Sequence, residues 1–130
     1  MDFSRYKEYR EGYRIEAKSA LHGLPSSIWE TYSAFANTYG GVILLGVKEG
    51  EDGSFIPSEV KDTAPLKKAF WNTVNNPNKV SANLVSDSSV KTFHDGECEM
   101  LAIEIPRARR EDRPVFLNDN PYKGTYRRKL

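Results

Sequence analysis

The last segment of the chain, residues 107–130, combines cationic and aromatic side chains in a way that suits contact with nucleic acid. It contains 8 Lys or Arg and 3 Asp or Glu, whereas residues 1–106 contain 11 and 15. Cations neutralise phosphates and release counterions, and aromatic rings stack on bases. The residues predicted to bind nucleic acid here are Arg107, Arg109, Arg110, Arg113, Lys123, Tyr126, Arg127 and Arg128. A solvated charged tail is the alternative interpretation.

The glycine pair Gly40-Gly41 stands between a predicted helix and an apolar run, in the stretch AFANTYGGVILLGV. Glycine allows the chain to leave a helix through positive φ, and it lets another backbone approach closely. We therefore predict a tight structural turn at Gly40 and Gly41. It is not a phosphate loop of the Walker A type, because the pattern Gly-x-x-x-x-Gly-Lys-Ser/Thr is missing from the sequence.

The composition excludes several other classes of protein. One cysteine and two histidines cannot assemble a zinc site of the usual Cys and His type, and one cysteine cannot form an internal disulfide. The longest apolar run, residues 42–47, is far shorter than the roughly 20 residues that span a bilayer. We expect a cytoplasmic protein with no membrane partner.

The elements that must position these residues follow from the spacing of the apolar positions. We expect a short helix near the N-terminus, a strand over 13–18, a helix from a capping box at Ser27 and Glu30 to about Asn37, and a central strand over 42–47. A short edge strand, a helix over 62–74, a hairpin of strands around 90–93 and 100–105, and a short last strand at 115–117 complete the prediction. The expected fold class is α+β, with a mixed β-sheet packed with two principal helices.

A set of short motifs resembles the AlbA-like DNA-binding domain that is related to the Schlafen core. In chain order the motifs are Glu16-x-Lys18, Leu24-Pro25, Ala34 to Thr38, Gly40-Gly41, Leu45-Gly46-Val47, Ile103-x-Ile105-Pro106, Pro114-Val115 and Tyr122 to Arg128. They extend from about residue 11 to residue 128, and the helix ending AFANT before Gly-Gly is the most specific of them. The resemblance implies a Schlafen-core-like sheet.

The resemblance also implies a place in a larger protein. Such domains usually stand at the N-terminus of bacterial and archaeal transcriptional regulators, before an ATPase-like segment and a winged helix. We therefore expect residues 1–130 to be one domain of a longer protein, with downstream domains of the same chain among its partners.

Three glutamates match an acidic site of Schlafen-type ribonucleases by position. These are Glu11, Glu16 and Glu49, and Glu51 or Asp52 could take the third place. Such a cluster could hold Mg²⁺ or Mn²⁺ and activate water against a phosphodiester. Ion pairs on a solvated strand face are the alternative, and Lys18 could balance a carboxylate there or touch phosphate.

The leading hypothesis is a nucleic-acid-binding module of a transcriptional regulator, with DNA favoured over RNA and no cofactor. One alternative is a metal-dependent endoribonuclease that uses the three glutamates as ligands and catalytic groups. Another is a protein-interaction or dimerisation module, since the apolar strand and mild net charge would also suit a homodimer. Asn37 and Thr38 are expected to cap the helix end or to face a ligand.

Overall fold

The computed structural model describes residues 3–12 and 14–129, and Tyr13 of the expected strand over 13–18 lies outside them. A four-stranded mixed sheet has the order β1-β2-β6-β5, with β1 (Ile15–Lys18) parallel to β2 (Gly41–Leu45). The other two pairs of neighbouring strands are antiparallel: β2 pairs with β6 (Cys98–Ile105), and β6 pairs with β5 (Val90–Asp95). The expected α+β class and the expected hairpin of the last two strands are confirmed.

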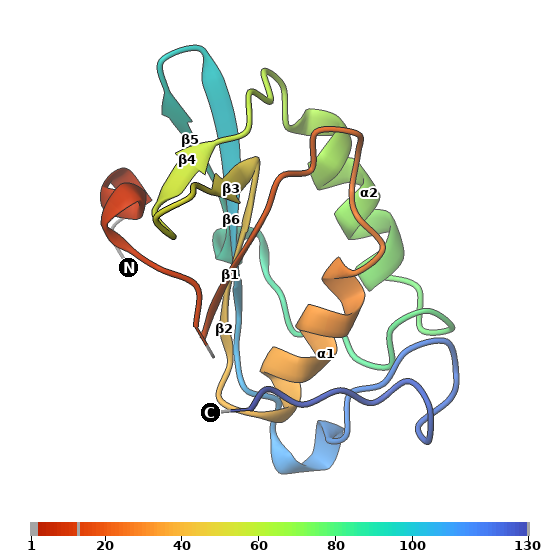
Figure 1. Cartoon of the computed structure of the whole chain (residues 1–130). Coiled ribbons are helices and arrows are strands. Elements are labelled where there is room, and N and C mark those ends of the chain that lie inside the picture. Colours follow the sequence, from red (N-terminus) through yellow and green to blue (C-terminus); the bar gives the residue numbers. More distant parts are fainter. Residues whose placement is uncertain (1–2, 13, 130) are drawn as a thin grey trace.

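Two helices cover one face of this sheet (Figure 1), and both were expected from the sequence. They are α1 (Ile28–Asn37) and α2 (Ala64–Val74). Side chains alternate along β2, so that Ile43 and Leu45 pack toward the helices while Leu44 lies on the other face. Because both faces are covered, β2 is a fully internal strand.

The other face of the sheet is covered by the N-terminal segment and a small second sheet. The 3-10 helix η1 (Phe3–Glu8) stands where a short helix near the N-terminus was expected, and it buries Phe3 and Tyr6 there. Strands β3 (Val47–Glu49) and β4 (Phe55–Pro57) form the second sheet and add Val47 and Phe55 to the same cluster. The sheet therefore lies between two hydrophobic clusters.

Three local predictions were wrong. The run 42–47 is not one strand, because Gly46 has φ 82° and ends β2 before Val47 enters the second sheet. Ser27 makes no side-chain capping bond to α1. Residues 115–117 form isolated bridges, Val80 with Leu117 and Phe116 with Thr125, instead of a strand.

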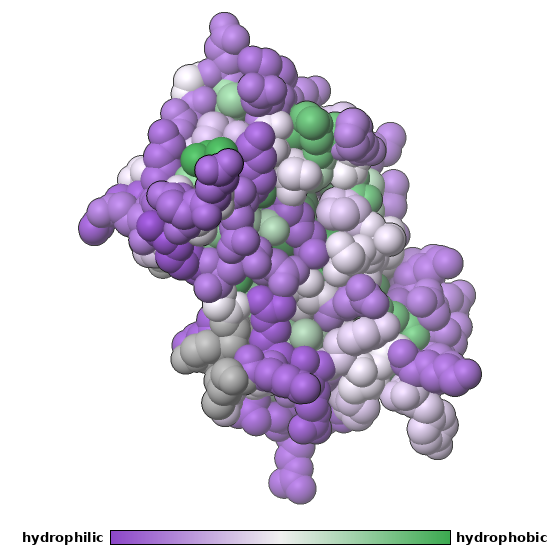
Figure 2. Space-filling model, in the orientation of Figure 1, coloured by the Kyte–Doolittle hydropathy of each residue, from purple (hydrophilic) through white to green (hydrophobic). Residues whose placement is uncertain are grey.

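The remaining chain after β6 returns to α1. The short 3-10 helix η3 (Arg110–Asp112) precedes an irregular segment that passes along α1 and ends beside β1 and β2 (Figure 1). The face of the molecule seen in Figure 2 is mainly hydrophilic, with small, separate apolar spots. None of the helices within residues 3–12 and 14–129 is long and apolar enough to cross a bilayer.

Candidate functional site

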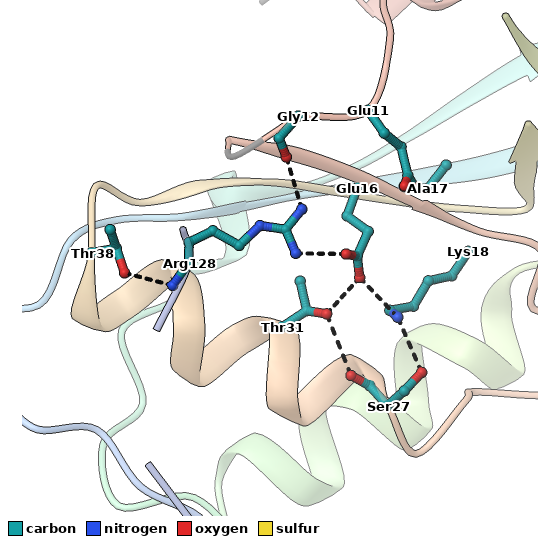
Figure 3. A network of polar contacts seen from close by, with 9 residues as sticks. All are labelled: Glu11, Gly12, Glu16, Ala17, Lys18, Ser27, Thr31, Thr38 and Arg128. Carbon is teal, nitrogen blue, oxygen red and sulfur yellow. Dashed lines mark hydrogen bonds and ion pairs between the residues drawn. The ribbon is translucent and has the colours of Figure 1, made fainter. Parts of the chain in front are cut away.

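Glu16 in β1 lies at the centre of a half-buried polar network above α1 (Figure 3). Its Oε1 accepts a hydrogen bond from Arg128 Nη1 at 2.7 Å. Its Oε2 accepts one from the Thr31 hydroxyl at 2.5 Å and pairs with Lys18 Nζ at 2.9 Å. Lys18 Nζ also donates to Ser27 Oγ at 3.0 Å, which explains why Ser27 does not cap α1. The polar face of β1 is therefore packed against the start of α1.

Arg128 connects the end of the described chain to this network. Its Nη2 donates to the carbonyl of Gly12 at 2.8 Å, and its backbone N–H donates to Thr38 Oγ1 at 3.0 Å. The guanidinium carbon also lies 4.9 Å from the centre of the Phe35 ring, within the range of a cation–π contact. Both Lys18 and Arg128, predicted to touch nucleic acid, are thus engaged with Glu16.

The network keeps Glu16 ionised. Burial alone would raise the pKa of its carboxyl, but the hydrogen bonds from Thr31, Lys18 and Arg128 outweigh it and lower the pKa to about 2. At neutral pH the site therefore holds one carboxylate between two cations.

Glu11, the second predicted acidic site residue, lies near both Glu16 and the third one, Glu49. Burial raises the pKa of Glu11, and the negative charges of Glu49 and Glu16 raise it further, against the opposing hydrogen bond from the Ala17 amide. That amide donates to Glu11 Oε2 at 3.1 Å. In the part of the chain that the structure describes, no group of three or more His, Cys, Asp or Glu residues is arranged to hold a metal ion.

A second polar cluster, missed by the sequence analysis, attaches the C-terminal segment to α1. The buried side chain of Asn37 accepts a hydrogen bond from the Val115 amide at 2.7 Å and donates to the carbonyls of Val115 at 2.9 Å and Tyr126 at 3.0 Å. Ser33 Oγ donates to the Val115 carbonyl at 2.7 Å and accepts from the Tyr126 amide at 3.0 Å. The Asn37 amide is therefore occupied by the C-terminal segment, and the hydroxyl of Thr38, the C-cap residue of α1, accepts from the Arg128 amide.

The segment after β6 and the C-terminal segment, which carry the predicted cationic residues, both line one hollow of about 510 Å³. Arg110 and Arg113, which follow β6, line it together with Arg127 from the C-terminal segment and Asn37 from α1. Arg110 and Arg127 are exposed and Arg113 is half-buried. Within residues 3–12 and 14–129 none of these three guanidinium groups makes an ion pair. We call this the basic hollow.

The other predicted cationic and aromatic residues lie elsewhere. Arg109 is 3.6 Å from Asp112 and 3.8 Å from Glu111, so its charge is locally balanced. Lys123 is exposed on the turn after Asn120. A hydrogen bond to Glu30 raises the pKa of the Tyr126 hydroxyl, which places that side chain over α1 and outside the basic hollow.

Arg107 lines a second hollow of about 520 Å³ with Arg14, Tyr39, Gly40 and Gly41. The glycine pair is required sterically, as predicted. Gly40 has φ 73°, and a Cβ there would lie 2.8 Å from the Ile105 carbonyl oxygen. A Cβ on Gly41 would lie 2.8 Å from both the Arg14 carbonyl oxygen and the Phe35 ring.

The architecture is that of an α+β domain whose C-terminal segment folds back on its first helix and first strand. A family model described as Schlafen, AlbA_2 matches residues 11–129, nearly the whole chain. The chain belongs to the Schlafen AlbA_2 family. Among curated proteins, none matches the chain significantly.

A solved structure supports the same fold. The solution NMR structure of the N-terminal domain of a RecG-related protein from Nitrosomonas europaea superposes with a TM-score of 0.69. The match covers 98% of this chain and 85% of that chain at 24% sequence identity, a level at which it demonstrates shared fold.

Proposed function

We propose that this domain binds nucleic acid by gripping the phosphate backbone at the basic hollow, as a module of a DNA-associated regulator. The observation that carries the proposal is the convergence of Arg110, Arg113 and Arg127 on one hollow from two separate segments. Membership of the Schlafen AlbA_2 family supports it. The neighbour from Nitrosomonas europaea is named as related to an ATP-dependent DNA helicase, which agrees with a DNA partner.

The chemistry of the basic hollow suits phosphate groups. Guanidinium groups present planar forks of donors that match phosphate oxygens, and they remain charged at any physiological pH. The net charge of the whole chain is only +1, so attraction to an anionic polymer must come from this local concentration of cations. Neutralising phosphates releases counterions, which makes such binding strongly dependent on salt.

A salt titration tests the proposal. Binding of a labelled DNA duplex is measured by fluorescence anisotropy for the wild type, for the triple variant Arg110→Gln, Arg113→Gln, Arg127→Gln, and for Arg109→Gln as a control. Each phosphate contact contributes about 0.9 to the slope of log affinity against log salt. The triple variant should lose affinity and about 2 to 3 units of slope, and the control should change little. Wild-type protein that binds no DNA or RNA even at low salt would contradict the proposal.

A metal-dependent endoribonuclease is the second candidate, supported by the nearness of Glu11 to both Glu16 and Glu49. Glu11 and Glu49 would hold a Mg²⁺ or Mn²⁺ ion with Glu16, although both oxygens of Glu16 already accept bonds from protein groups. A bound ion of this kind lowers the pKa of water and so supplies a nucleophile against a phosphodiester.

The decisive variant for this candidate is Glu49→Gln, because Glu49 is exposed and its replacement leaves the Glu16 network intact. Wild-type protein with Mn²⁺ should cut labelled tRNA on a denaturing gel, and the variant should not. Cleavage that is equal in the two proteins would exclude Glu49 as a group that the reaction needs.

A further inference from the structure

The second hollow lies next to the basic hollow but has a different chemical character. The segment after β6 borders both: Arg107 at its start lines the second hollow, and Arg110 and Arg113 line the basic one. No aromatic side chain lines the basic hollow within the described residues, whereas the second hollow is lined by Tyr39, whose surface is 48% exposed. One hollow thus offers charge alone, and the other offers charge with an aromatic ring.

The second hollow carries two cations on separate elements. Arg14 lies just before β1 and Arg107 just after β6, and both side chains are exposed. Neither makes an ion pair within residues 3–12 and 14–129. The acidic group on the lining, Glu104, is 3.5 Å from Lys91, so its charge is balanced by a cation on the neighbouring strand. The net character of the hollow is therefore cationic.

Size and lining fit a flat organic ring joined to a phosphate. The hollow of about 520 Å³ falls within the usual range for small-ligand sites, about 300–1,000 Å³. Its lining includes Gly40 and Gly41, which carry no side chain, and the exposed Pro106, and these suit the face of a ring. A tyrosine ring is a common platform on which an unpaired base stacks, and every base has a face that can do so.

We propose that the hollow bounded by Arg14, Tyr39 and Arg107 holds one unpaired nucleotide of a single strand whose neighbouring phosphates occupy the basic hollow. This inference rests on the proposed function and narrows it. A base within a duplex is stacked on its neighbours and cannot present its face to Tyr39. The domain should accordingly prefer single-stranded nucleic acid, or a duplex with an unpaired end, over a continuous duplex.

The test compares two ligands and separates this inference from the proposed function. A fluorescein-labelled single strand of about 12 nucleotides and the blunt duplex of the same sequence are titrated by anisotropy. The proteins are the wild type, Tyr39→Ala, Tyr39→Phe, the double variant Arg14→Gln, Arg107→Gln, and Arg109→Gln as the control. Circular dichroism checks that each variant is folded.

Tyr39→Ala should weaken binding of the single strand about tenfold, in the range measured for loss of one base–aromatic stack, and should change duplex binding by less than about twofold. Tyr39→Phe, which keeps the ring, should bind as the wild type does. The Arg14 and Arg107 double variant should lose about 0.7 to 1.4 units of salt slope on the single strand.

Three results would overturn the inference. If Tyr39→Ala binds the single strand as the wild type does, or loses equal affinity for both ligands, no base stacks on Tyr39. In either case retained binding that depends on Arg110, Arg113 and Arg127 would leave the proposed function standing. A free mononucleotide that alone binds as tightly as the strand would point to a small-molecule site and would also overturn it.

Discussion

Asn37 uses both ends of its side-chain amide to hold the C-terminal segment, and it is only 9% exposed. Replacing it with alanine leaves the Val115 amide and the Tyr126 carbonyl without these partners. Because unsatisfied buried polar groups each cost about 1–3 kcal/mol, Asn37→Ala should lower the free energy of unfolding by about 2–4 kcal/mol. Urea denaturation followed by circular dichroism measures this change.

Asn72→Ala is the matched control, since Asn72 lies on the exposed side of α2. Its effect should stay within about 0.5 kcal/mol, as is usual for surface positions. Equal stability of the two variants would show that the Asn37 bonds contribute no net free energy.

The lowered pKa of Glu16 leads to a prediction about the stability of the protein in acid. The pKa of its carboxyl in the folded protein is about 2, below its ordinary value of 4.5. A lowered pKa stabilises the fold above pH 4.5, and this contribution is lost as the pH falls toward 2. Glu16→Gln should therefore reduce the slope of unfolding free energy against pH in this interval by as much as about 1.4 kcal/mol per pH unit.

Urea unfolding at a series of pH values provides the measurement, with Glu97→Gln as control because the Glu97 side chain is 89% exposed. Curves for Glu16→Gln and the wild type that run parallel from pH 4.5 to 2 would contradict the assigned pKa.

For individual residues, the sequence analysis identified members of the polar network, but it did not identify most of the residues that they contact. Glu16 and Lys18 were expected to neighbour each other on the polar face of a strand, and they do. The engagement of both with α1, and of Glu16 with Arg128, depends on partners 9 to 112 residues away in the chain. No local spacing encodes such distant pairs. The signal in the sequence for the second cluster was a pair of polar residues one helical turn apart, Ser33 and Asn37, and the structure shows that both are buried.

Among the elements, strand β2 shows where an apolar run misleads. Hydrophobicity alone predicted a continuous strand over 42–47. The positive φ at Gly46 ends β2 at that point, and Val47 begins β3. A glycine inside a strand pattern often marks such a change of direction. The capping box failed for a different reason, since the hydroxyl of Ser27 is engaged by Lys18.

Gly40 provides a prediction for the turn between α1 and β2. Gly40→Ala would force a side chain into positive φ and within 2.8 Å of the Ile105 carbonyl oxygen. We expect a loss of about 2 kcal/mol or more in unfolding free energy, because strain and steric overlap add together. Thermal unfolding measures the effect.

Gly12→Ala serves as the control for this turn. Gly12 has no heavy atom within 4 Å of its hypothetical Cβ and lacks positive φ, so alanine should be tolerated there. A wild-type melting temperature for Gly40→Ala would refute the steric requirement.

In the whole molecule, the sheet separates two hydrophobic clusters, and the polar contacts of the C-terminal segment lie along the edge of one of them. Alternating apolar residues and the family motifs were sufficient to predict the α+β class. They could not predict that Arg110, Arg113 and Arg127 line one hollow, because this depends on how an irregular segment folds back over α1.

Amide hydrogen exchange can test this attachment across the molecule. The amides of Tyr126 and Arg128 donate to Ser33 Oγ and Thr38 Oγ1, whereas no acceptor is seen among the described residues for the amides of Arg127 and Lys129. Exchange should therefore alternate along this segment, slow at 126 and 128 and fast at 127 and 129. Uniformly fast exchange from 126 to 129 would show that the segment is detached in solution.

The return of residues 115–128 to α1 also determines when the domain can fold during synthesis. The ribosome releases a chain from its N-terminus at about 5–20 residues per second. Ser33, Asn37 and Glu16 emerge early, but their partners Val115, Tyr126 and Arg128 emerge some 80 to 110 residues later. Until then these polar groups lack their final partners. The nascent domain must therefore wait for its last segment before the polar contacts that attach it to α1 and β1 can form.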